Sequence, residues 1–347
     1  MDILHEMNQL EMGGIERVIV NLAKYDKENK HTVLAYRDGP MREELERAGA
    51  KVSVCLEGDA EVSFNADIIH IHCGGSQSHL APSIHEGFTI VETIHSPVKS
   101  PNRKEWLAAR VGVSNVVSGI NPGAITIHNG IDIPAMEPIR PAGWLRKQIR
   151  SDRPIVGRIG RIGPDKCMED FLLACELAQR QIDFDVVIAG PEAFGAPGYL
   201  GKCLLMADSL PVRNCHFIGA QRCADFMNEI DVFMYPSPTE GFGLVFAEAM
   251  LFDKPIVTWK TAAAQEVCAG HAVLTDDNVP ALAYGLLDVL QQPSLRDALV
   301  DGSSDVVKEF FSADRMAANY QEFYRSLNAK SAVPADTESL SKSIAAS

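Results

Sequence analysis

Two glutamates eight positions apart stand out in the segment PSPTEGFGLVFAEAM, residues 236–250. Glu240 falls in a proline- and glycine-rich loop, where Gly241 and Gly243 let the backbone pass close to a ligand. Glu248 falls within an apolar run that predicts a buried helix, so its carboxylate needs hydrogen-bonding partners. A sugar with several hydroxyl groups is one such partner, because an ionised carboxylate accepts two or more hydrogen bonds. A purely structural acid, bonded to Ser237 or Thr239, is the alternative.

Two cations follow another predicted strand. The segment PIVGRIGRIGPDK places Arg161 and Lys166 five residues apart, across a glycine- and proline-rich turn before a helical pattern. A guanidinium with forked hydrogen bonds and an ammonium with a point charge can together clamp a diphosphate. Arg158 competes for the guanidinium role, but it lies within the strand and is less suited to it. Ordinary surface salt bridges are the alternative explanation.

Near the start of the chain, Gly13 and Gly14 open the segment GGIERVIVNLA, whose apolar positions predict a helix. Two glycines at a helix start leave their backbone N–H groups accessible, and these groups can bind a phosphate. A tight turn between a strand and a helix is the alternative. The segment does not match GxGxxG, which counts against a dinucleotide-dependent dehydrogenase.

These residues need a framework that brings strand ends together. Short β-branched runs alternate with helical patterns along the chain, which predicts an α/β fold with parallel sheets. In such folds, ligands bind at the carboxyl ends of the strands. The predicted strands are HTVLAY (31–36), KVSVCL (51–56), ADIIHIH (66–72), FTIVETIH (88–95), AITIHNG (124–130), PIVGRIG (154–160), DFDVVIAG (183–190), CHFIGA (215–220), DVFMYPS (231–237) and KPIVTW (254–259).

The length of 347 residues exceeds one typical core and predicts two domains. A glycine- and proline-rich stretch places their boundary near residues 138–152. We expect two Rossmann-like domains that face each other across a cleft. The predicted parts are an N-terminal domain at 1–140, a C-terminal domain at 150–314, a closing helix at 315–330 that returns to the first domain, and a disordered tail at 331–347.

Charge and composition restrict the partners. The net charge of −14 argues against nucleic acid and against a broad anionic membrane surface, so membrane contact is at most peripheral. No apolar run approaches the roughly 18 residues of a spanning helix, and the first residues lack the pattern of a secretion signal. Eight scattered cysteines without a CxxC suit reduced thiols. We therefore expect a cytoplasmic protein.

In their order along the chain, several segments resemble the retaining glycosyltransferases of family 4 (glycosyl transferases group 1), which have the GT-B fold. These segments include GGIERVIVNLA, TIHSP, IHNGID, GRIGPDK and PSPTEGFGLVFAEAM, of which the last is the most specific. The resemblance covers nearly the whole chain. It implies a nucleotide-diphosphate sugar donor held by the C-terminal domain and a hydroxyl acceptor in the N-terminal domain. It implies no cofactor, because the nucleotide sugar is a substrate.

The resemblance also implies roles for individual residues. Arg161 and Lys166 would bind the donor diphosphate, together with a backbone N–H of Gly14. Glu240 and the amides that follow it would hold the donor sugar, and Glu248 would accept hydrogen bonds from the ribose. The implied catalytic set is His95, Arg161, Lys166 and Glu240, and the implied binding set is Gly13, Gly14, Arg161, Lys166, Glu240, Gly241, Phe242, Gly243, Leu244 and Glu248.

His95, in the segment ETIHSP, matches the strand-end histidine that lies near the sugar in this family, where it can bond a hydroxyl. A core or capping histidine is the alternative. Two features depart from the family pattern. Cys167 stands where a glycine usually follows the phosphate lysine, and AAAQE (262–266) stands for Gly-Gly-x-x-Glu. Backbone contacts to the donor are in question at both places.

In the implied mechanism, preplaced cations and N–H groups stabilise the leaving diphosphate, and the acceptor attacks from the same face. The pair Asp183-x-Asp185 has the spacing by which metal-dependent glycosyltransferases of the other major fold hold a cation. It precedes the strand VVIAG, so it lies at the amino end, about 15 Å from the carboxyl-end cleft. We therefore expect transfer without a divalent metal.

Other functions share parts of this pattern. A nucleotide-sugar epimerase of the GT-B fold would use the same donor site, and a noncatalytic sugar-nucleotide-binding protein would keep the fold without the reaction. A metal site at His70, His72, Cys73 and His79 is a further alternative, because His70 and His72 share one face of a strand.

Overall fold

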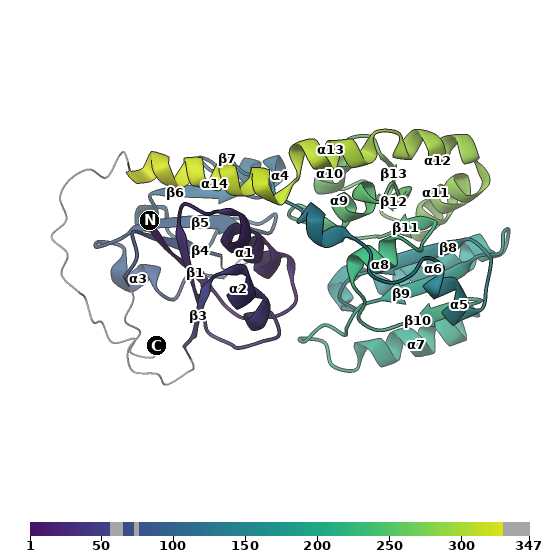
Figure 1. Ribbon diagram of the computed structural model, residues 1–347. Helices are drawn as coiled ribbons and strands as arrows, with labels where there is room; N and C mark the ends of the chain where they lie inside the picture. The colour runs from purple at the N-terminus through teal and green to yellow at the C-terminus, as the bar shows by residue number, and fades with distance from the viewer. Residues whose placement is uncertain (56–64, 73–75, 329–347) are drawn as a thin grey trace. The chain divides into compact units, whose positions relative to one another are not determined.

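The computed structural model describes residues 1–55, 65–72 and 76–328. The predicted disordered tail and Cys73 lie outside these residues. The chain divides into two compact units (Figure 1). Unit 1 contains Met1–Gly130 together with Ser312–Ser347, and unit 2 contains Ile131–Phe311.

Unit 1 is built on a parallel sheet in the order β3-β2-β1-β4-β5-β6-β7. Its central strands are buried on both faces, since helices cover the two sides of the sheet. The strands are β1 (Asp2–Met7), β2 (Lys30–Ala35), β3 (Lys51–Val54), β4 (Ile68–Ile71), β5 (Thr89–Ile94), β6 (Ala109–Gly112) and β7 (Ile125–Thr126). The helices are α1 (Gly14–Tyr25), α2 (Arg42–Ala48), α3 (Ala81–Ile84), the 3-10 turn η1 (Lys104–Trp106), α4 (Asn115–Ile120) and α14 (Ala313–Asn328).

Helix α14 belongs to unit 1 although it ends the described chain, and it lies beside α1 (Figure 1). Tyr320 and Tyr324 are fully buried in one apolar cluster with Ile3 of β1 and Val18 of α1. This packing explains why the last helix returns to the first unit. The closing helix predicted from the sequence is confirmed, as α14.

Unit 2 has a second parallel sheet, in the order β10-β9-β8-β11-β12-β13. Its strands are β8 (Ile155–Ile159), β9 (Asp185–Ala189), β10 (Cys215–Phe217), β11 (Val232–Met234), β12 (Ile256–Trp259) and β13 (Ala272–Thr275). Its helices are η2 (Ile133–Met136), α5 (Trp144–Ile149), η3 (Pro164–Lys166), α6 (Met168–Gln179), α7 (Tyr199–Ser209), α8 (Cys223–Met227), α9 (Leu244–Leu251), α10 (Ala262–Cys268), α11 (Val279–Gln291), α12 (Pro293–Val300) and α13 (Ser303–Phe310).

The division at Gly130 lies upstream of the interval predicted for the domain boundary. The reason is a set of hydrogen bonds that ties the connecting segment to unit 2. The backbone N–H groups of Ile139 and Arg140 donate to Asp225, and those of Gly143 and Leu145 donate to Glu229. These bonds make α5 part of the second unit.

The alternation of strands and helices predicted from the sequence is confirmed in both units. The predicted strands do not include β1, β6 and β13. Of these, β6 and β13 have four residues each and are only partly buried, whereas β1 is mostly buried. Short, half-buried strands lack the continuous apolar run that marks a central parallel strand.

Candidate functional site

The turn after β8 carries the two cations predicted to bind a diphosphate. Lys166 ends the 3-10 turn η3, and its Nζ lies 2.9 Å from Oε1 of Glu240, in the loop after β11. Strands β8 and β11 are neighbours in the sheet, so their carboxyl-end loops meet. The structure therefore brings together two predicted site residues that are 74 positions apart in the sequence.

The Lys166–Glu240 pair is largely enclosed, with side chains that are 14% and 15% exposed. Ser237 also donates to Glu240 Oε1, over 2.8 Å. Burial lowers the pKa of the lysine, but the charges of Tyr235 and Glu240 and the hydrogen bond that Lys166 donates to Glu240 outweigh it, and the pKa is raised. Lys166 is therefore held as a cation in a largely enclosed position.

The two arginines near this pair differ in exposure. Arg161 is exposed and makes no hydrogen bond or ion pair with any other residue of the described chain. Arg158 is 1% exposed, its guanidinium lies over the Tyr235 ring, and its Nη2 donates to the Lys166 carbonyl over 2.5 Å. Burial lowers the pKa of Arg158. Arg158 thus supports the backbone of the turn, while Arg161 is available to a ligand.

Two glycines let the ends of β8 and β9 approach each other. A Cβ placed on Gly190 would lie 1.9 Å from the carbonyl oxygen of Gly160, and Gly190 has a φ of +138°. Cys167 stands where the family that the sequence resembles usually has glycine, and it adopts a φ of +46°. It therefore takes the left-handed conformation that glycine favours, with a side chain attached.

The prediction that Glu248 is a buried carboxylate is wrong. Glu248 lies on α9 but is only half-buried, as are Leu244 and Val245 of the same helix. This part of α9 borders the surface, so the apolar run does not mean that the helix is buried on all sides. The Cys223 thiol donates to Glu248 Oε2 over 3.2 Å, which supplies a protein partner. The hydroxyl of Ser237, considered as a partner for Glu248, bonds Glu240 instead.

The residues between the two glutamates form the start of α9. Gly243 precedes the helix with a φ of +83°, and a Cβ there would lie 2.6 Å from the Phe246 ring. Phe242 is buried, and its ring packs edge-on against Phe311. Gly241 is also buried, and Leu244 is the first helical residue. The loop conformation therefore requires glycine at position 243.

In unit 1, helix α1 begins at Gly14, and Gly13 precedes it in an extended conformation. A Cβ on Gly13 would lie 2.5 Å from Oε2 of Glu16, so this carboxylate lies over the helix start. Glu16 is 6% exposed. A phosphate that bound the amides of Gly13 and Gly14 would have to share this position with the glutamate.

His95 follows the last residue of β5, as the sequence pattern predicts. Its Nε2 lies 3.0 Å from Nδ1 of His72, which follows β4. Burial lowers the pKa of His95 to about 3, so the ring is neutral at physiological pH. No described residue bonds its Nδ1.

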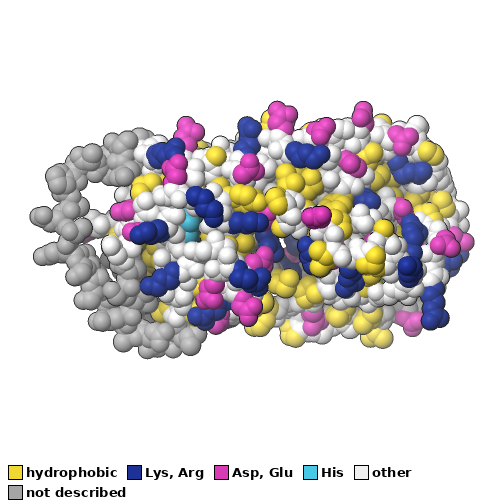
Figure 2. Space-filling model, viewed as in Figure 1, with side chains coloured by type: hydrophobic (Ala, Val, Ile, Leu, Met, Phe, Trp, Pro, Cys, Tyr) yellow, Lys and Arg dark blue, Asp and Glu magenta, His cyan; other side chains and the backbone are white. Residues whose placement is uncertain are grey.

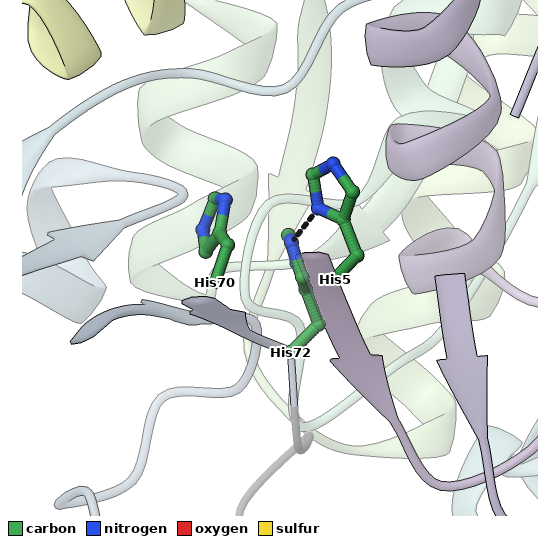
Figure 3. Close-up of side chains that lie close together, drawn as sticks. All are labelled: His5, His70 and His72. Atoms are coloured by element: carbon green, nitrogen blue, oxygen red, sulfur yellow. Dashed lines mark hydrogen bonds between the residues drawn. The ribbon is translucent and has the colours of Figure 1, made fainter. Parts of the chain in front are cut away.

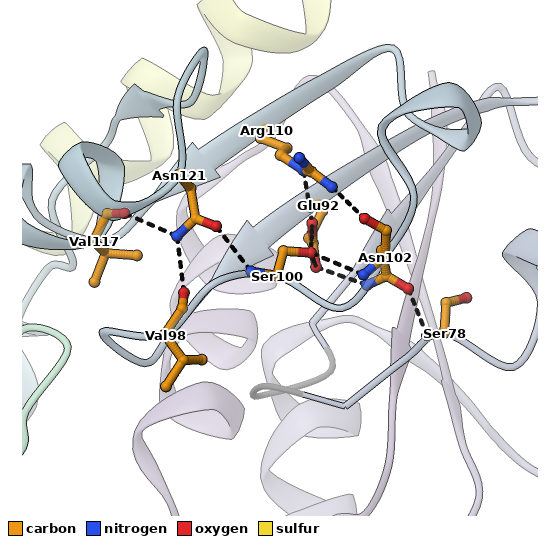
Figure 4. Close-up of polar contacts among 8 residues, drawn as sticks. All are labelled: Ser78, Glu92, Val98, Ser100, Asn102, Arg110, Val117 and Asn121. Atoms are coloured by element: carbon orange, nitrogen blue, oxygen red, sulfur yellow. Dashed lines mark hydrogen bonds and ion pairs between the residues drawn. The ribbon is translucent and has the colours of Figure 1, made fainter.

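A polar network holds the loop that follows His95 (Figure 4). Glu92 of β5 accepts hydrogen bonds from the Ser100 hydroxyl, the Asn102 amide and Nε of Arg110. Asn121 accepts from the Ser100 backbone N–H over 2.8 Å. These bonds connect the loop to β5, β6 and the end of α4, so the chain after His95 has a fixed path.

Two of the histidines considered as metal ligands, His70 and His72, already have hydrogen-bonded rings. Nδ1 and Nε2 of His70 lie 2.6 Å from the Tyr324 hydroxyl and 2.7 Å from Oγ1 of Thr93. His5, His70 and His72 nevertheless bring ring nitrogens within 4.8 Å of one another (Figure 3). The His79 ring packs on Tyr36. A metal would therefore have to replace existing bonds.

The Asp183-x-Asp185 pair lies at the amino end of β9, as predicted, because Asp185 is the first residue of that strand. Asp185 is fully buried and accepts hydrogen bonds from Ser151 and Arg153. Asp183 pairs with Arg213 over 2.7 Å. Both carboxylates have structural partners at the amino end of β9, whereas the Lys166–Glu240 pair lies at the carboxyl ends of β8 and β11.

A pocket of about 440 Å³ opens at the carboxyl ends of β12 and β13. Its lining includes Trp259, Ala262 and Thr275, and it shares only Pro238 with the loop of Glu240. The AAAQE segment that departs from the family pattern begins at this pocket, as the first turn of α10. The pocket therefore lies beside the Lys166–Glu240 pair and does not contain it.

On the face drawn in Figure 2, basic and acidic side chains are interspersed across the described surface. No described helix is long and apolar enough to cross a membrane. The seven cysteines that the structure describes are free thiols.

Residues 145–304 match the model of the family described as Glycosyl transferases group 1. The match contains Lys166, Glu240 and Glu248. Over 188 residues, the chain is 26% identical to a GDP-mannose-dependent alpha-(1-6)-phosphatidylinositol dimannoside mannosyltransferase of Mycobacterium tuberculosis. This alignment covers 53% of this chain and 46% of that protein. The chain thus spans about half the length of the curated relative that it matches.

Solved structures with similar folds include Anabaena Alr3699/HepE in complex with UDP and glucose, with a TM-score of 0.80 at 20% identity. That likeness covers 94% of this chain and 100% of the other. A glycosyltransferase from Rickettsia africae has a TM-score of 0.77 at 18% identity, covering 95% and 99% of the two chains. The fold is therefore GT-B, and the predicted fold class is confirmed. The matches together support the predicted enzyme class, a glycosyltransferase.

Proposed function

We propose that the protein transfers a sugar from a nucleotide-diphosphate sugar to a hydroxyl group of an acceptor, with retention of configuration and without a divalent metal. The observation that carries this proposal is the Lys166–Glu240 contact of 2.9 Å, in the unit that matches the glycosyltransferase family. Arg161, in the same turn as Lys166, bonds no other described residue. In this proposal, Lys166 binds the diphosphate and Glu240, in contact with it, binds the donor sugar.

The remaining bonding capacity of the pair suits a donor. An ammonium group has three donors, and Glu240 takes one of those of Lys166, which leaves others for phosphate oxygens. The bonds from Lys166 and Ser237 both end on Oε1 of Glu240, so Oε2 can accept from a sugar hydroxyl. Arg161 adds a second, forked donor to the diphosphate.

These interactions favour breakage of the bond between the sugar and the diphosphate. Negative charge collects on the leaving diphosphate as that bond breaks, so cations held in place beforehand stabilise the transition state more than the ground state. The raised pKa of Lys166 keeps this charge present through the neutral range. The site can therefore neutralise the leaving group with its own side chains.

A purified sample of the full chain with UDP-, GDP- and ADP-sugars, a panel of hydroxyl acceptors and excess EDTA tests the proposal. We expect release of the nucleoside diphosphate and a product with the anomeric configuration of the donor. An inverted product would contradict retention, and activity that returns only with Mg²⁺ or Mn²⁺ would contradict metal independence. Conversion of the donor without any acceptor would indicate an epimerase, and no thermal stabilisation by any donor would contradict the whole proposal.

A further inference from the structure

A row of hydrogen-bonded rings crosses the sheet of unit 1, from the amino ends of its strands to the carboxyl ends. His31 lies at the start of β2, His5 within β1, His72 directly after β4, and His95 directly after β5. Nδ1 of His31 lies 2.9 Å from Nε2 of His5, and Nδ1 of His5 lies 3.0 Å from Nε2 of His72. The last contact joins Nδ1 of His72 to Nε2 of His95 over 3.0 Å. Figure 3 shows the middle of this row, the bond between His5 and His72.

The row ends at Asp26. Oδ2 of Asp26 lies 3.3 Å from Nε2 of His31, an electrostatic contact outside strict hydrogen-bond geometry. Asp26 and His31 line a hollow of about 500 Å³ in unit 1. Side chains of Asn29 and Gln321 also donate to Asp26.

Asp26 stays ionised in this setting. Burial alone raises the pKa of a carboxyl group, but the contact with His31 and the hydrogen bonds from Asn29 and Gln321 outweigh it, and the pKa of Asp26 is lowered. The row therefore has a permanent negative charge at one end. That charge faces the ring of His31.

The rings of His5, His72 and His95 are neutral. Burial, reinforced by repulsion from neighbouring histidines, lowers the pKa of His5 and His72 well below the ordinary value, and burial does the same for His95. A neutral imidazole carries one N–H and one bare nitrogen. Each bond between two rings therefore needs one proton from one of the two partners.

The carboxylate decides the direction of these protons. His31 must point its N–H at Asp26, because a bare nitrogen there would face the negative charge. With this single proton on Nε2 of His31, its Nδ1 accepts from Nε2–H of His5, whose Nδ1 accepts from Nε2–H of His72. By the same rule, Nδ1 of His72 accepts from Nε2–H of His95. The reversed arrangement would place the lone pair of His31 against the carboxylate.

We infer that Asp26, through His31, His5 and His72, holds His95 as its Nε2–H tautomer and keeps Nδ1 of His95 as a hydrogen-bond acceptor. The four residues behind His95 are thus positioning residues. Nδ1 has no partner among the described residues, so it can accept from a hydroxyl group of a bound sugar. Only this last role rests on the proposed function.

His70 stands beside the row and does not belong to it. Its ring centre lies 4.0 Å from that of His72, but its nitrogens bond the Tyr324 hydroxyl and the Thr93 hydroxyl. These partners keep His70 from competing for the bonds of His72.

Nitrogen NMR of the imidazole rings in the ¹⁵N-labelled full chain tests the inference without any substrate. In the native protein, we expect His95 to show a protonated Nε2 and a bare Nδ1. Asp26→Asn keeps the shape and removes the charge, and we expect it to convert His95 to the Nδ1–H form or to a mixture. Asp67→Asn is the matched control, because Asp67 accepts from the Asp2 backbone in the same unit and has no contact with the row.

His5→Leu breaks the row without altering Asp26, so it serves as a second variant if Asp26→Asn does not fold. We expect it also to abolish the single tautomer of His95. A native His95 in the Nδ1–H form would overturn the inference, as would an unchanged Nε2–H form in either folded variant. Because the readout is the tautomer, a failure here is distinct from absence of sugar transfer.

Discussion

At the residue scale, Arg161 and Lys166 differ in their protein partners but share a proposed role. Arg161 is exposed and unpaired among the described residues, whereas Lys166 is held by Glu240. A function in binding explains why a cation at a strand end would have no partner within its own unit. Because Arg161 has no bonded partner among the described residues, its replacement tests catalysis with little effect on stability.

We expect Arg161→Ala to lower kcat/KM by an amount that corresponds to a loss of about 2 to 4 kcal/mol of transition-state stabilisation. This is the usual effect of removing a charged partner of a substrate from a desolvated site. The free energy of unfolding should change by less than about 0.5 kcal/mol, because an exposed and unpaired side chain is removed. Arg180→Ala is the control, since Arg180 is an exposed arginine of the same unit, bonded to Glu176. Unchanged kinetics in a folded Arg161→Ala protein would contradict the assignment.

Glu240 and Glu248 should separate sugar transfer from nucleotide binding. Glu240 bonds the lysine proposed to bind phosphate, whereas Glu248 bonds Cys223 on a half-buried helix face. We expect Glu240→Gln to reduce the transfer rate about 100-fold, the effect of removing one interaction that stabilises the transition state, while calorimetry shows little change in binding of the bare nucleotide. Glu248→Gln should weaken nucleotide binding first. The opposite assignment would follow if Glu240→Gln alone abolished binding of the bare nucleotide.

At the element scale, the ends of β8 and β9 must come close for the phosphate turn to form. Gly190 donates its N–H to the Gly219 carbonyl over 2.8 Å, and Gly160 donates to Ala189 over 3.1 Å. These bonds leave no room for a side chain between the two strands. The turn that carries Arg161 and Lys166 begins at this point.

We expect Gly190→Ala to destabilise the protein by about 2 to 4 kcal/mol, from a strained φ combined with a clash against backbone. A Cβ there would lie 1.9 Å from the Gly160 carbonyl oxygen, which cannot move away as a flexible side chain could. Gly195→Ala is the matched control, because a Cβ at Gly195 meets no atom within 4 Å. Equal urea midpoints for the two variants would contradict this expectation.

At the scale of the whole molecule, stability should depend strongly on pH through the buried histidines. The pKa values of His5, His70, His72 and His95 are lowered in the folded state, that of His95 to about 3. Between the ordinary value of about 6.5 and the lowered values, the unfolded chain binds protons that the folded chain does not. Their contribution to stability is present above about pH 6.5 and diminishes as the pH falls.

We expect the free energy of unfolding to fall with decreasing pH below about 6.5, with a slope of up to about 5 kcal/mol per pH unit from four such histidines. Urea unfolding at pH 8, 7, 6 and 5 measures this slope. Asp26 adds a separate decrease at lower pH, below about 3.9, because its pKa is lowered as well. A flat profile between pH 8 and 5 would show that these rings are charged or exposed.

Much of the architecture could be predicted from neighbouring residues. Alternation of β-branched runs and helical periods predicts the parallel α/β fold, because each pattern reports the local conformation and which face is buried. The order of strand, turn and helix also places Lys166, Glu240 and His95 at carboxyl ends, and Asp185 at an amino end. These features depend on positions along one segment, so the sequence by itself determined them.

Contacts between segments were decided only by the tertiary structure. Three sets of contacts join residues from different elements. They are the Lys166–Glu240 contact, the bond between Glu248 and Cys223, and the row from Asp26 to His95. In the row, His5 and His31 occur singly in apolar strands, where they look like ordinary core residues. They meet because the register of neighbouring parallel strands sets which side chains lie next to each other, and no periodicity within one segment contains that register.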